Sequence, residues 1–409
     1  MPTERLYYND SHLIEFEAKV TDISERVSGW TAVSLDRTAF YPTGGGQPSD
    51  TGTLGGSRVV EVIDDAHHGI WHVLQGRAPK LGAIVKGRVD WPRRLDHMQQ
   101  HTGQHILSQA FVTLFKAPTH SFRVLEQSCE IDVALSHPSA ELIERAVELA
   151  NNVIWEDREI RVLHVTPEQA AELPLRKDPV KHGELRLIEI DGFDMTPCGG
   201  THAKRTGEVG MIAVRAWERA KGLTRIDWVA GVRALADYRR ANKSARAVAA
   251  LFSSGRDDIS PLVEKILDEN KELQRRGHLL EEMAAKTEAQ ELLSTATPFG
   301  QGKASRIVAQ IFINRDAESL RRLALALAAH SETVALLGAR DQETARLVFA
   351  RSVDAPGDMN ALMRDACALL DGRGGGKPDL AQGGGKNIVK LEQALEMAKQ
   401  HLVAFLPKG

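Results

Sequence analysis

The stretch QQHTGQH at residues 99–105 decides the fold together with PCGGTH at residues 197–202. Each stretch carries two metal-binding side chains four residues apart, His101 and His105 in the first and Cys198 and His202 in the second. Three imidazoles and one thiolate make a complete tetrahedral set for Zn²⁺, which prefers nitrogen and sulfur ligands. The sequence therefore predicts a zinc centre assembled from two distant segments.

The spacing predicts how each pair is presented. Two histidines at i and i+4 lie on the same face of a helix, and the residues after His105 are apolar at helical spacing. Pro197 and the two glycines after Cys198 predict a loop that folds tightly around an ion. Thr102 stands where a zinc protease needs glutamate, which excludes that class of enzyme. Either pair alone is also compatible with polar helix residues and a buried thiol, so the coincidence of both pairs favours a metal site.

In this order and at this separation, the two motifs resemble the editing domain of alanyl-tRNA synthetases and of the free-standing AlaX trans-editing proteins. Threonyl-tRNA synthetase carries a related domain. The segment FYPTGGGQP at residues 40–48, followed by Asp50-Thr51-Gly52, is similar to the glycine-rich motif of the family. The resemblance covers residues 1–240. Further on, the glycine-rich stretch at residues 372–385 resembles the DHHA1 domain of alanyl-tRNA synthetases.

The resemblance implies a trans-editing deacylase with Zn²⁺ as its cofactor. Its substrate would be tRNA(Ala) mischarged with serine first and glycine second. Neither motif offers an acidic general base, so Gln104 and Thr102 on the ligand helix are the candidates for orienting water, although both could equally face solvent. Ser121 stands where the family places a residue that recognises the aminoacyl group. Four protein ligands would close the zinc shell, which leaves open whether zinc activates water or positions the substrate.

The fold class expected is α+β. Short strand-like runs separated by turns predict a small β-barrel over residues 1–90, and residues 91–240 would form the α+β editing domain. Within that domain the apolar pattern predicts a helix over residues 139–155 and strands at Leu185–Ile190 and Thr224–Val229. A helical hairpin or coiled-coil arm is expected over residues 241–298, and an α/β DHHA1-like domain over residues 299–409.

The charge distribution points to a phosphate-rich partner. The net charge is only −3, but residues 204–246 hold eleven Lys/Arg against four acids. A basic surface beside a metal site suits tRNA, although the same excess could be a solvated helix face. The residues predicted to contact substrate or tRNA are Thr43, Gly44, Gly45, Gly46, Lys204, Arg205, Arg373 and Lys377, the last two in a flexible glycine-rich loop.

Composition sets the remaining expectations. The three cysteines, Cys129, Cys198 and Cys367, cannot make a disulfide framework and fit a reducing compartment. No apolar run approaches a membrane span, so a cytoplasmic protein is expected. A heptad-like seam in the arm predicts a homodimer through the arm or the C-terminal domain.

Two other functions fit the same residues. One is a deacylase for another tRNA, such as Ser-tRNA(Thr), because the threonyl enzyme uses the same type of motif. The other is a non-catalytic tRNA-binding protein with a structural zinc. The intact ligand set and the alanine-type glycine motif favour the alanine-specific deacylase.

Overall fold

The structure is a computed structural model that describes residues 3–25, 30–65, 69–177, 184–299 and 305–404. It divides into two compact units, Met1–Leu251 and Phe252–Gly409, each described here by itself. Both units mix helices with mainly antiparallel sheets, so the predicted α+β class is confirmed. None of the helices in the described ranges combines the length and the apolar character needed to cross a bilayer.

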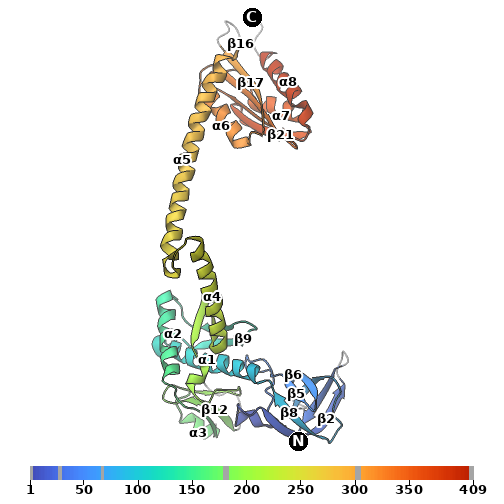
Figure 1. Ribbon diagram of the computed structural model, residues 1–409, viewed down its shortest axis with the longest axis vertical. Coiled ribbons are helices and arrows are strands. Elements are labelled where there is room, and N and C mark those ends of the chain that lie inside the picture. Colours follow the sequence, from blue (N-terminus) through green and yellow to red (C-terminus); the bar gives the residue numbers. More distant parts are fainter. Residues whose placement is uncertain (1–2, 26–29, 66–68, 178–183, 300–304, 405–409) are drawn as a thin grey trace. The chain divides into compact units, whose positions relative to one another are not determined.

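The first unit begins with a closed barrel of six strands (Figure 1). In barrel order the strands are β2 (Glu15–Glu25), β3 (Thr31–Leu35), β7 (Gly69–Gln75), β6 (Ser57–Asp65), β5 (Gly52–Leu54) and β8 (Ile84–Val89). Alternate residues point inward, as the burial of every second residue of β8 shows, and the interior is filled with aliphatic and aromatic side chains. Two short strands outside the barrel, β1 (Glu4–Arg5) and β4 (Arg37–Thr38), pair with each other in parallel.

Helix α1 (Trp91–Phe115) is the centre of the rest of the first unit. It packs against α2 (Ala140–Trp155) and against the sheet β14 (Ile212–Ala220), β15 (Leu223–Ala230), β10 (Cys129–Val133) and β9 (Thr119–Val124). Every residue from His97 to Ser108 is buried. A helix covered on all sides lacks a single apolar stripe, so its histidines lie inside the protein and not on a solvated face.

A second, smaller sheet carries the other half of the site. It is made of β11 (Ile160–Val165), β12 (Leu185–Ile190) and β13 (Asp194–Pro197), with the short helix α3 (Pro167–Ala171) after β11. Strand β13 ends directly before Cys198. The unit closes with α4 (Gly231–Leu251), which follows β15 without a loop.

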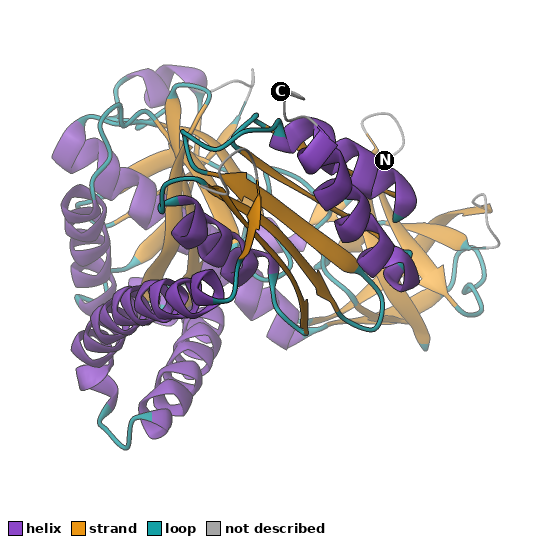
Figure 2. Ribbon diagram, turned by 90° about the horizontal axis from the view of Figure 1, so that it is seen from above, coloured by secondary structure: helices purple, strands orange, loops and turns teal. Residues whose placement is uncertain are grey.

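The second unit is a six-stranded sheet with helices against both faces (Figure 2). The order is β16 (Thr297–Phe299), β17 (Ser305–Ile313), β18 (Thr333–Arg340), β19 (Ala345–Arg351), β21 (Leu380–Gly385) and β20 (Gly372–Gly376), with only β17 and β18 parallel. Helices α7 (Met359–Leu369) and α8 (Leu391–Ala404) share one core, while α6 (Ala317–Ala328) and the end of α5 (Ile259–Ser294) share the other.

The arm expected over residues 241–298 is not a separate domain in the structure. Its first part belongs to α4, which starts at Gly231 in the first unit. Its second part is α5, whose last turns bury Ala285 and Ala289 and pack against α6 in the second unit. The sequence predicted a helical hairpin or short coiled coil here from its helical residue pattern, and such a pattern does not reveal the tertiary partners of a helix.

The prediction of a flexible loop at residues 372–385 is wrong, because this stretch forms the hairpin β20–β21 at the edge of the sheet. The glycines allow α7 to approach. A Cβ added at Gly374 or Gly383 would lie 2.7 or 2.5 Å from the sulfur of Cys367 on α7. Close packing of a helix on a strand pair thus accounts for glycines that the sequence suggested were there for flexibility.

Candidate metal centre

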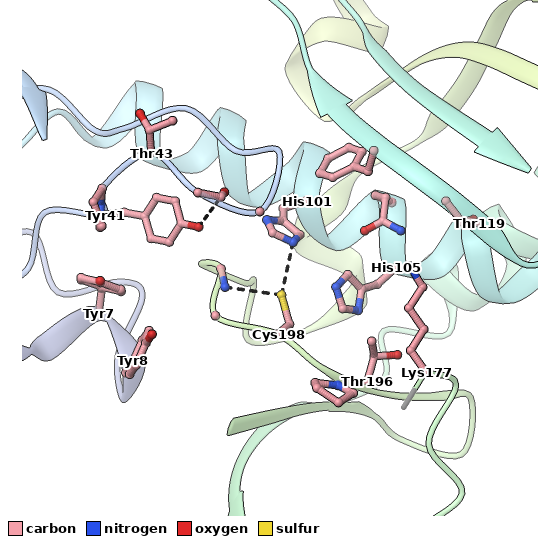
Figure 3. Close-up of a pocket in the computed structure, with 18 of the residues that line it drawn as sticks. Tyr7, Tyr8, Tyr41, Thr43, His101, His105, Thr119, Lys177, Thr196 and Cys198 are labelled. Carbon is pink, nitrogen blue, oxygen red and sulfur yellow. Dashed lines mark hydrogen bonds between the residues drawn. The ribbon is translucent and has the colours of Figure 1, made fainter. Parts of the chain in front are cut away.

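Four side chains converge beside α1: His101 and His105 from the helix, and Cys198 and His202 from the loop after β13. Figure 3 shows three of them, His101, His105 and Cys198. Their ligand atoms all lie within 4.8 Å of one another. The sulfur of Cys198 is 3.3 Å from Nε2 of His101 and 3.3 Å from Nε2 of His202. One metal ion can therefore reach all four groups.

Each imidazole is held through its other nitrogen. Nδ1 of His101 lies 2.7 Å from Oε1 of Gln47, Nδ1 of His105 lies 3.2 Å from Oδ2 of Asp194, and Nδ1 of His202 lies 3.2 Å from the hydroxyl of Thr102. In each case Nε2 is left to bind a metal, and in His101 and His202 it faces the sulfur of Cys198. Metal-binding histidines are typically oriented in this way, by a partner on the nitrogen that does not ligate.

The electrostatics of the cluster favour metal binding. Burial opposes ionisation of the Cys198 thiol, but its interactions with His101 and the hydrogen bond from His105 together outweigh it and hold the pKa of the thiol well below its usual value. Burial lowers the pKa of His202 to about 3, so its imidazole is neutral. A thiolate and a neutral imidazole are the forms that bind metals.

An ion pair supports His105 from behind. Arg176 donates to both oxygens of Asp194, at 2.7 and 3.1 Å, and both side chains are almost fully buried. Burial opposes ionisation of Asp194, yet His105 and Arg176 together lower its pKa to about 2. The carboxylate is therefore charged and acts as a fixed acceptor for the ring of His105.

The loop of residues 198–202 is fixed from two sides. Arg186 on β12 donates to the carbonyl oxygens of Cys198 at 2.6 Å and of Gly200 at 3.1 Å. On the other side the loop touches α1, where a Cβ at Gly200 would lie only 2.3 Å from Cε1 of His101. Gly199 has no such constraint, since its nearest neighbour would be the hydroxyl of Tyr8 at 3.5 Å. The second glycine is therefore needed for the loop to approach the helix.

A cavity of about 520 Å³ lies over the cluster (Figure 3). The barrel side contributes Tyr7, Tyr8, Tyr41 and the start of the glycine motif, and the other walls come from α1, β9, β13 and residues 176–177. Hydroxyl groups from several elements line it, and its cations are Arg5, Arg176 and Lys177. Asp64 also lines the cavity and pairs with Arg5 at 2.8 Å, and Arg176 pairs with Asp194. The cavity is thus polar, and it ends at three of the four cluster residues, His101, His105 and Cys198.

The structure places both predicted catalytic residues on the wall of this cavity. Nε2 of Gln104 donates to Ser108 at 2.7 Å, which leaves its carbonyl oxygen as the available group. The hydroxyl of Ser121 donates to Asp132 at 2.6 Å and still has its lone pairs to accept a hydrogen bond.

The glycine motif divides into two parts. Thr43, Gly44 and Gly45 line the cavity. Gly46 does not, because its backbone lies against β9, where a Cβ would sit 2.4 Å from the carbonyl oxygen of Phe122. Gln47 then links the motif to the cluster, accepting at His101 and donating to Thr201 at 2.8 Å.

The predicted tRNA contacts outside the motif lie elsewhere. Lys204 pairs with Asp10 at 3.1 Å and Arg205 with Asp157 at 2.6 Å, and neither lines the cavity. Arg373 is on β20 and Lys377 directly follows it, so both belong to the second unit. The acids that neutralise Lys204 and Arg205 are distant in sequence and were not visible in a count over residues 204–246.

Four residues that support the ligands were not predicted from the sequence, namely Gln47, Asp194, Arg176 and Arg186. Two of them carried a signal. Gln47 directly follows the three glycines of the glycine motif. Asp194 stands four residues before Cys198 on a strand, where side chains alternate between the two faces, so Asp194 lies on the same face as Thr196. The two arginines come from positions that only the tertiary structure reveals.

Comparisons with known proteins agree with these motifs. The family model "Threonyl and Alanyl tRNA synthetase second additional domain" matches residues 185–227, and the model "DHHA1 domain" matches residues 303–404. The alanine–tRNA ligase of Methanoregula boonei is 32% identical over all of this chain, and that of Pyrobaculum neutrophilum is 31% identical over 97% of it. This chain spans 44% of the length of each ligase.

Among solved structures, the C-Ala domain of Aquifex aeolicus alanyl-tRNA synthetase matches 25% of this chain and 93% of its own length, with 27% identity and a TM-score of 0.24, a score that carries no argument about the fold. A full-length match is the alanyl-tRNA editing protein AlaX-L of Pyrococcus horikoshii, which is 32% identical over 98% of this chain and 99% of its own length. The resemblance seen in the motifs is confirmed, and the chain belongs to the AlaX-L family of alanyl-tRNA editing proteins.

Proposed function

We propose that this chain hydrolyses the ester bond of mischarged tRNA(Ala), chiefly Ser-tRNA(Ala) and secondarily Gly-tRNA(Ala), with zinc held by His101, His105, Cys198 and His202. Membership of an editing family makes it an aminoacyl-tRNA deacylase. The observation that carries the proposal is the ligand cluster at the end of a polar cavity of about 520 Å³. That space suits a small amino acid esterified to a ribose.

Zinc fits the donor set. Tetrahedral zinc with nitrogen and sulfur ligands keeps the ligand atoms about 3.3–3.8 Å apart. The two sulfur–nitrogen distances of 3.3 Å are at the short end of that range, and the remaining ligand atoms lie within 4.8 Å. When bound, zinc would supply a Lewis acid that polarises an oxygen or binds an amine.

The protein's own groups provide the rest. The free carbonyl oxygen of Gln104 is an acceptor suited to holding a water molecule or the α-amine of the substrate. Lys177 reaches into the cavity near His105 and Thr119, so its ammonium is available to the charge that develops on the ester oxygen (Figure 3). Burial lowers the pKa of Lys177, and Arg176 beside it acts in the same direction.

The polar lining supports discrimination between serine and alanine. Thr43, Thr119, Ser121 and Thr196 present hydroxyl groups to the cavity. These hydroxyls already have partners in the protein, but their remaining lone pairs can accept a hydrogen bond from a serine hydroxyl, which the methyl group of alanine cannot donate. Correctly charged Ala-tRNA(Ala) is then the poorer substrate.

The test is deacylation of Ser-tRNA(Ala), with Gly-tRNA(Ala), Ala-tRNA(Ala) and Ser-tRNA(Thr) as comparators. Wild type and Cys198→Ala are compared, and Cys367→Ala serves as the matched control, since that thiol is buried in the second unit. We expect rapid loss of Ser-tRNA(Ala) with wild type and the control only. Faster turnover of Ser-tRNA(Thr) than of Ser-tRNA(Ala) would mean that another tRNA is the substrate. Zinc binding without turnover of any of these tRNAs would favour a non-catalytic tRNA-binding protein.

We also propose a homodimer through α5, in an antiparallel arrangement. The seam Ile259, Leu262, Ile266, Leu273, Leu280 and Met283 is interrupted by Glu269 and Arg276. Parallel pairing would set Glu269 against Glu269 of the second copy. Antiparallel pairing centred near residue 271 sets Leu262 against Leu280 and Ile259 against Met283 of the second copy. It sets Glu269 against Leu273, about one helical turn from Arg276 of the second copy, in place of a like charge. Sedimentation equilibrium of wild type and Leu273→Glu tests this, and a monomeric wild type would contradict it.

A further inference from the structure

The basic segment at residues 204–246 separates into paired and unpaired cations. Acids from the surrounding structure, several of them outside the segment, lie within 4.0 Å of six of its eleven Lys/Arg residues, namely Lys204, Arg205, Arg215, Arg225, Arg233 and Arg240. Most of the apparent excess of positive charge is therefore used in holding the first unit together.

Three of the remaining cations gather on α4. Arg239, Lys243 and Arg246 are exposed, and within the described residues no carboxylate pairs with them. They line a groove of about 420 Å³ together with Asn242 and Ala247. From Arg239 to the end of the helix the sequence contains no acidic residue.

The spacing places these cations on one face. Positions i, i+4 and i+7 of a helix lie above one another, and seven residues rise about 10 Å along the axis. Phosphates along one strand of a duplex are about 3.4 Å apart along its axis, so this span matches roughly three phosphate-to-phosphate steps.

The charged surface of α5 differs from this α4 face in how its cations are paired. On α5 the cations each have an acid three or four residues away, as in Lys265–Glu269, Lys271–Asp268 and Arg275–Glu272. Such pairs cancel charge at the surface. The face of Arg239, Lys243 and Arg246 has no such compensation, so it presents a concentrated positive potential to a partner.

We infer that the α4 face of Arg239, Lys243 and Arg246 binds the phosphate backbone of the tRNA whose acceptor end enters the cavity of the first unit. The inference deepens the proposed function and rests on it. Recognition here is by charge and spacing, so this face adds affinity for any tRNA of suitable shape and leaves the choice of amino acid to the cavity.

The experiment compares two triple variants with the same change of charge. The test variant is Arg239→Gln/Lys243→Gln/Arg246→Gln, and the control is Lys265→Gln/Lys271→Gln/Arg275→Gln on α5. Binding of uncharged tRNA(Ala) is measured by fluorescence anisotropy over a series of salt concentrations. Removing three phosphate contacts lowers the slope of log K against log salt by about 2 to 3. We expect this loss in the test variant, while the control keeps the wild-type slope.

Equal slopes in the two triple variants, or wild type that does not bind tRNA, would overturn the inference. Circular dichroism and zinc content check that the first unit is intact, since glutamine is a good helix former. Deacylation kinetics separate this inference from the proposed function. We expect the test variant to raise KM and keep kcat for Ser-tRNA(Ala). If the wild type binds tRNA through this face but does not deacylate it, the proposed function is wrong, while the assignment of this face as a tRNA-binding surface stands.

Discussion

Replacing Gly200 by alanine tests whether the loop–helix contact sets the geometry of the metal site. The added Cβ would lie 2.3 Å from Cε1 and 2.6 Å from Nδ1 of His101. Ordinary contacts begin near 3.4 Å, so the ring or the loop must withdraw by about 1 Å. Gly199→Ala is the matched control, because its Cβ meets only the hydroxyl of Tyr8 at 3.5 Å and neither glycine has a positive φ.

His101 has little freedom to withdraw. Its Nδ1 is bound to Gln47 at 2.7 Å, and its ring lies 5.4 Å from the ring of Phe122, measured between centroids. Metal–ligand distances tolerate only about 0.2 Å. We therefore expect Gly200→Ala to weaken zinc binding by about 10- to 100-fold or more, as loss of a supporting contact does. Overpacking should also cost the metal-free protein about 1–3 kcal/mol of stability.

The assay is competition for zinc against a chromophoric chelator, with wild type, Gly199→Ala and Gly200→Ala in parallel. Thermal unfolding of the metal-free proteins gives the overpacking cost separately. Gly199→Ala should bind zinc within about threefold of wild type, since it creates only an ordinary contact. Equal zinc affinity in the two alanine variants would refute the argument that residue 200 positions the loop against His101.

Three further outcomes follow from contacts described above. Asp194→Asn should lower zinc affinity about 10- to 100-fold, because it removes the charge that orients His105 while keeping the side chain's shape, and an unchanged chelator titration would contradict this. Burial lowers the pKa of His72 to about 4, so the unfolded chain takes up the proton first and the free energy of unfolding should fall by about 3 kcal/mol between pH 6.5 and 4. Urea unfolding of His72→Gln should show a flatter profile over that range. Gly383→Ala should destabilise the second unit by about 1–3 kcal/mol, because the added Cβ would lie 2.5 Å from the sulfur of Cys367. The zinc affinity of this variant should stay at the wild-type value, because the metal centre lies in the first unit.

Local patterns predicted the elements that carry the ligands. The helix expected over residues 139–155 is α2, capped by Ser139, and the strand expected at Leu185–Ile190 is β12. Both segments have a clear apolar period, which is the strongest signal that a single sequence offers. The same reasoning placed His101 and His105 on one helix.

What escaped prediction depends on distant partners. The sequence around Lys204 and Arg205 indicated free cations, but Asp10 and Asp157 lie far away in the chain. The glycines of residues 372–385 indicated flexibility, whereas close packing of Gly374 and Gly383 against Cys367 explains two of them better. Residue type and spacing reveal local conformation, but they do not reveal which face of another element will meet it.

The distance in sequence between the two halves of the metal centre has a consequence for biosynthesis. As the ribosome makes the chain, the helix with His101 and His105 emerges well before Cys198 and His202 exist. Strand β10 can pair with β9 at once, but its other neighbour, β15, is also made after the ligand loop. Two imidazoles alone are half a ligand set, so a nascent or prematurely terminated chain cannot retain zinc. Metal capture thus reports only that translation has passed His202, while β14, β15 and α4 of the first unit are still to be made.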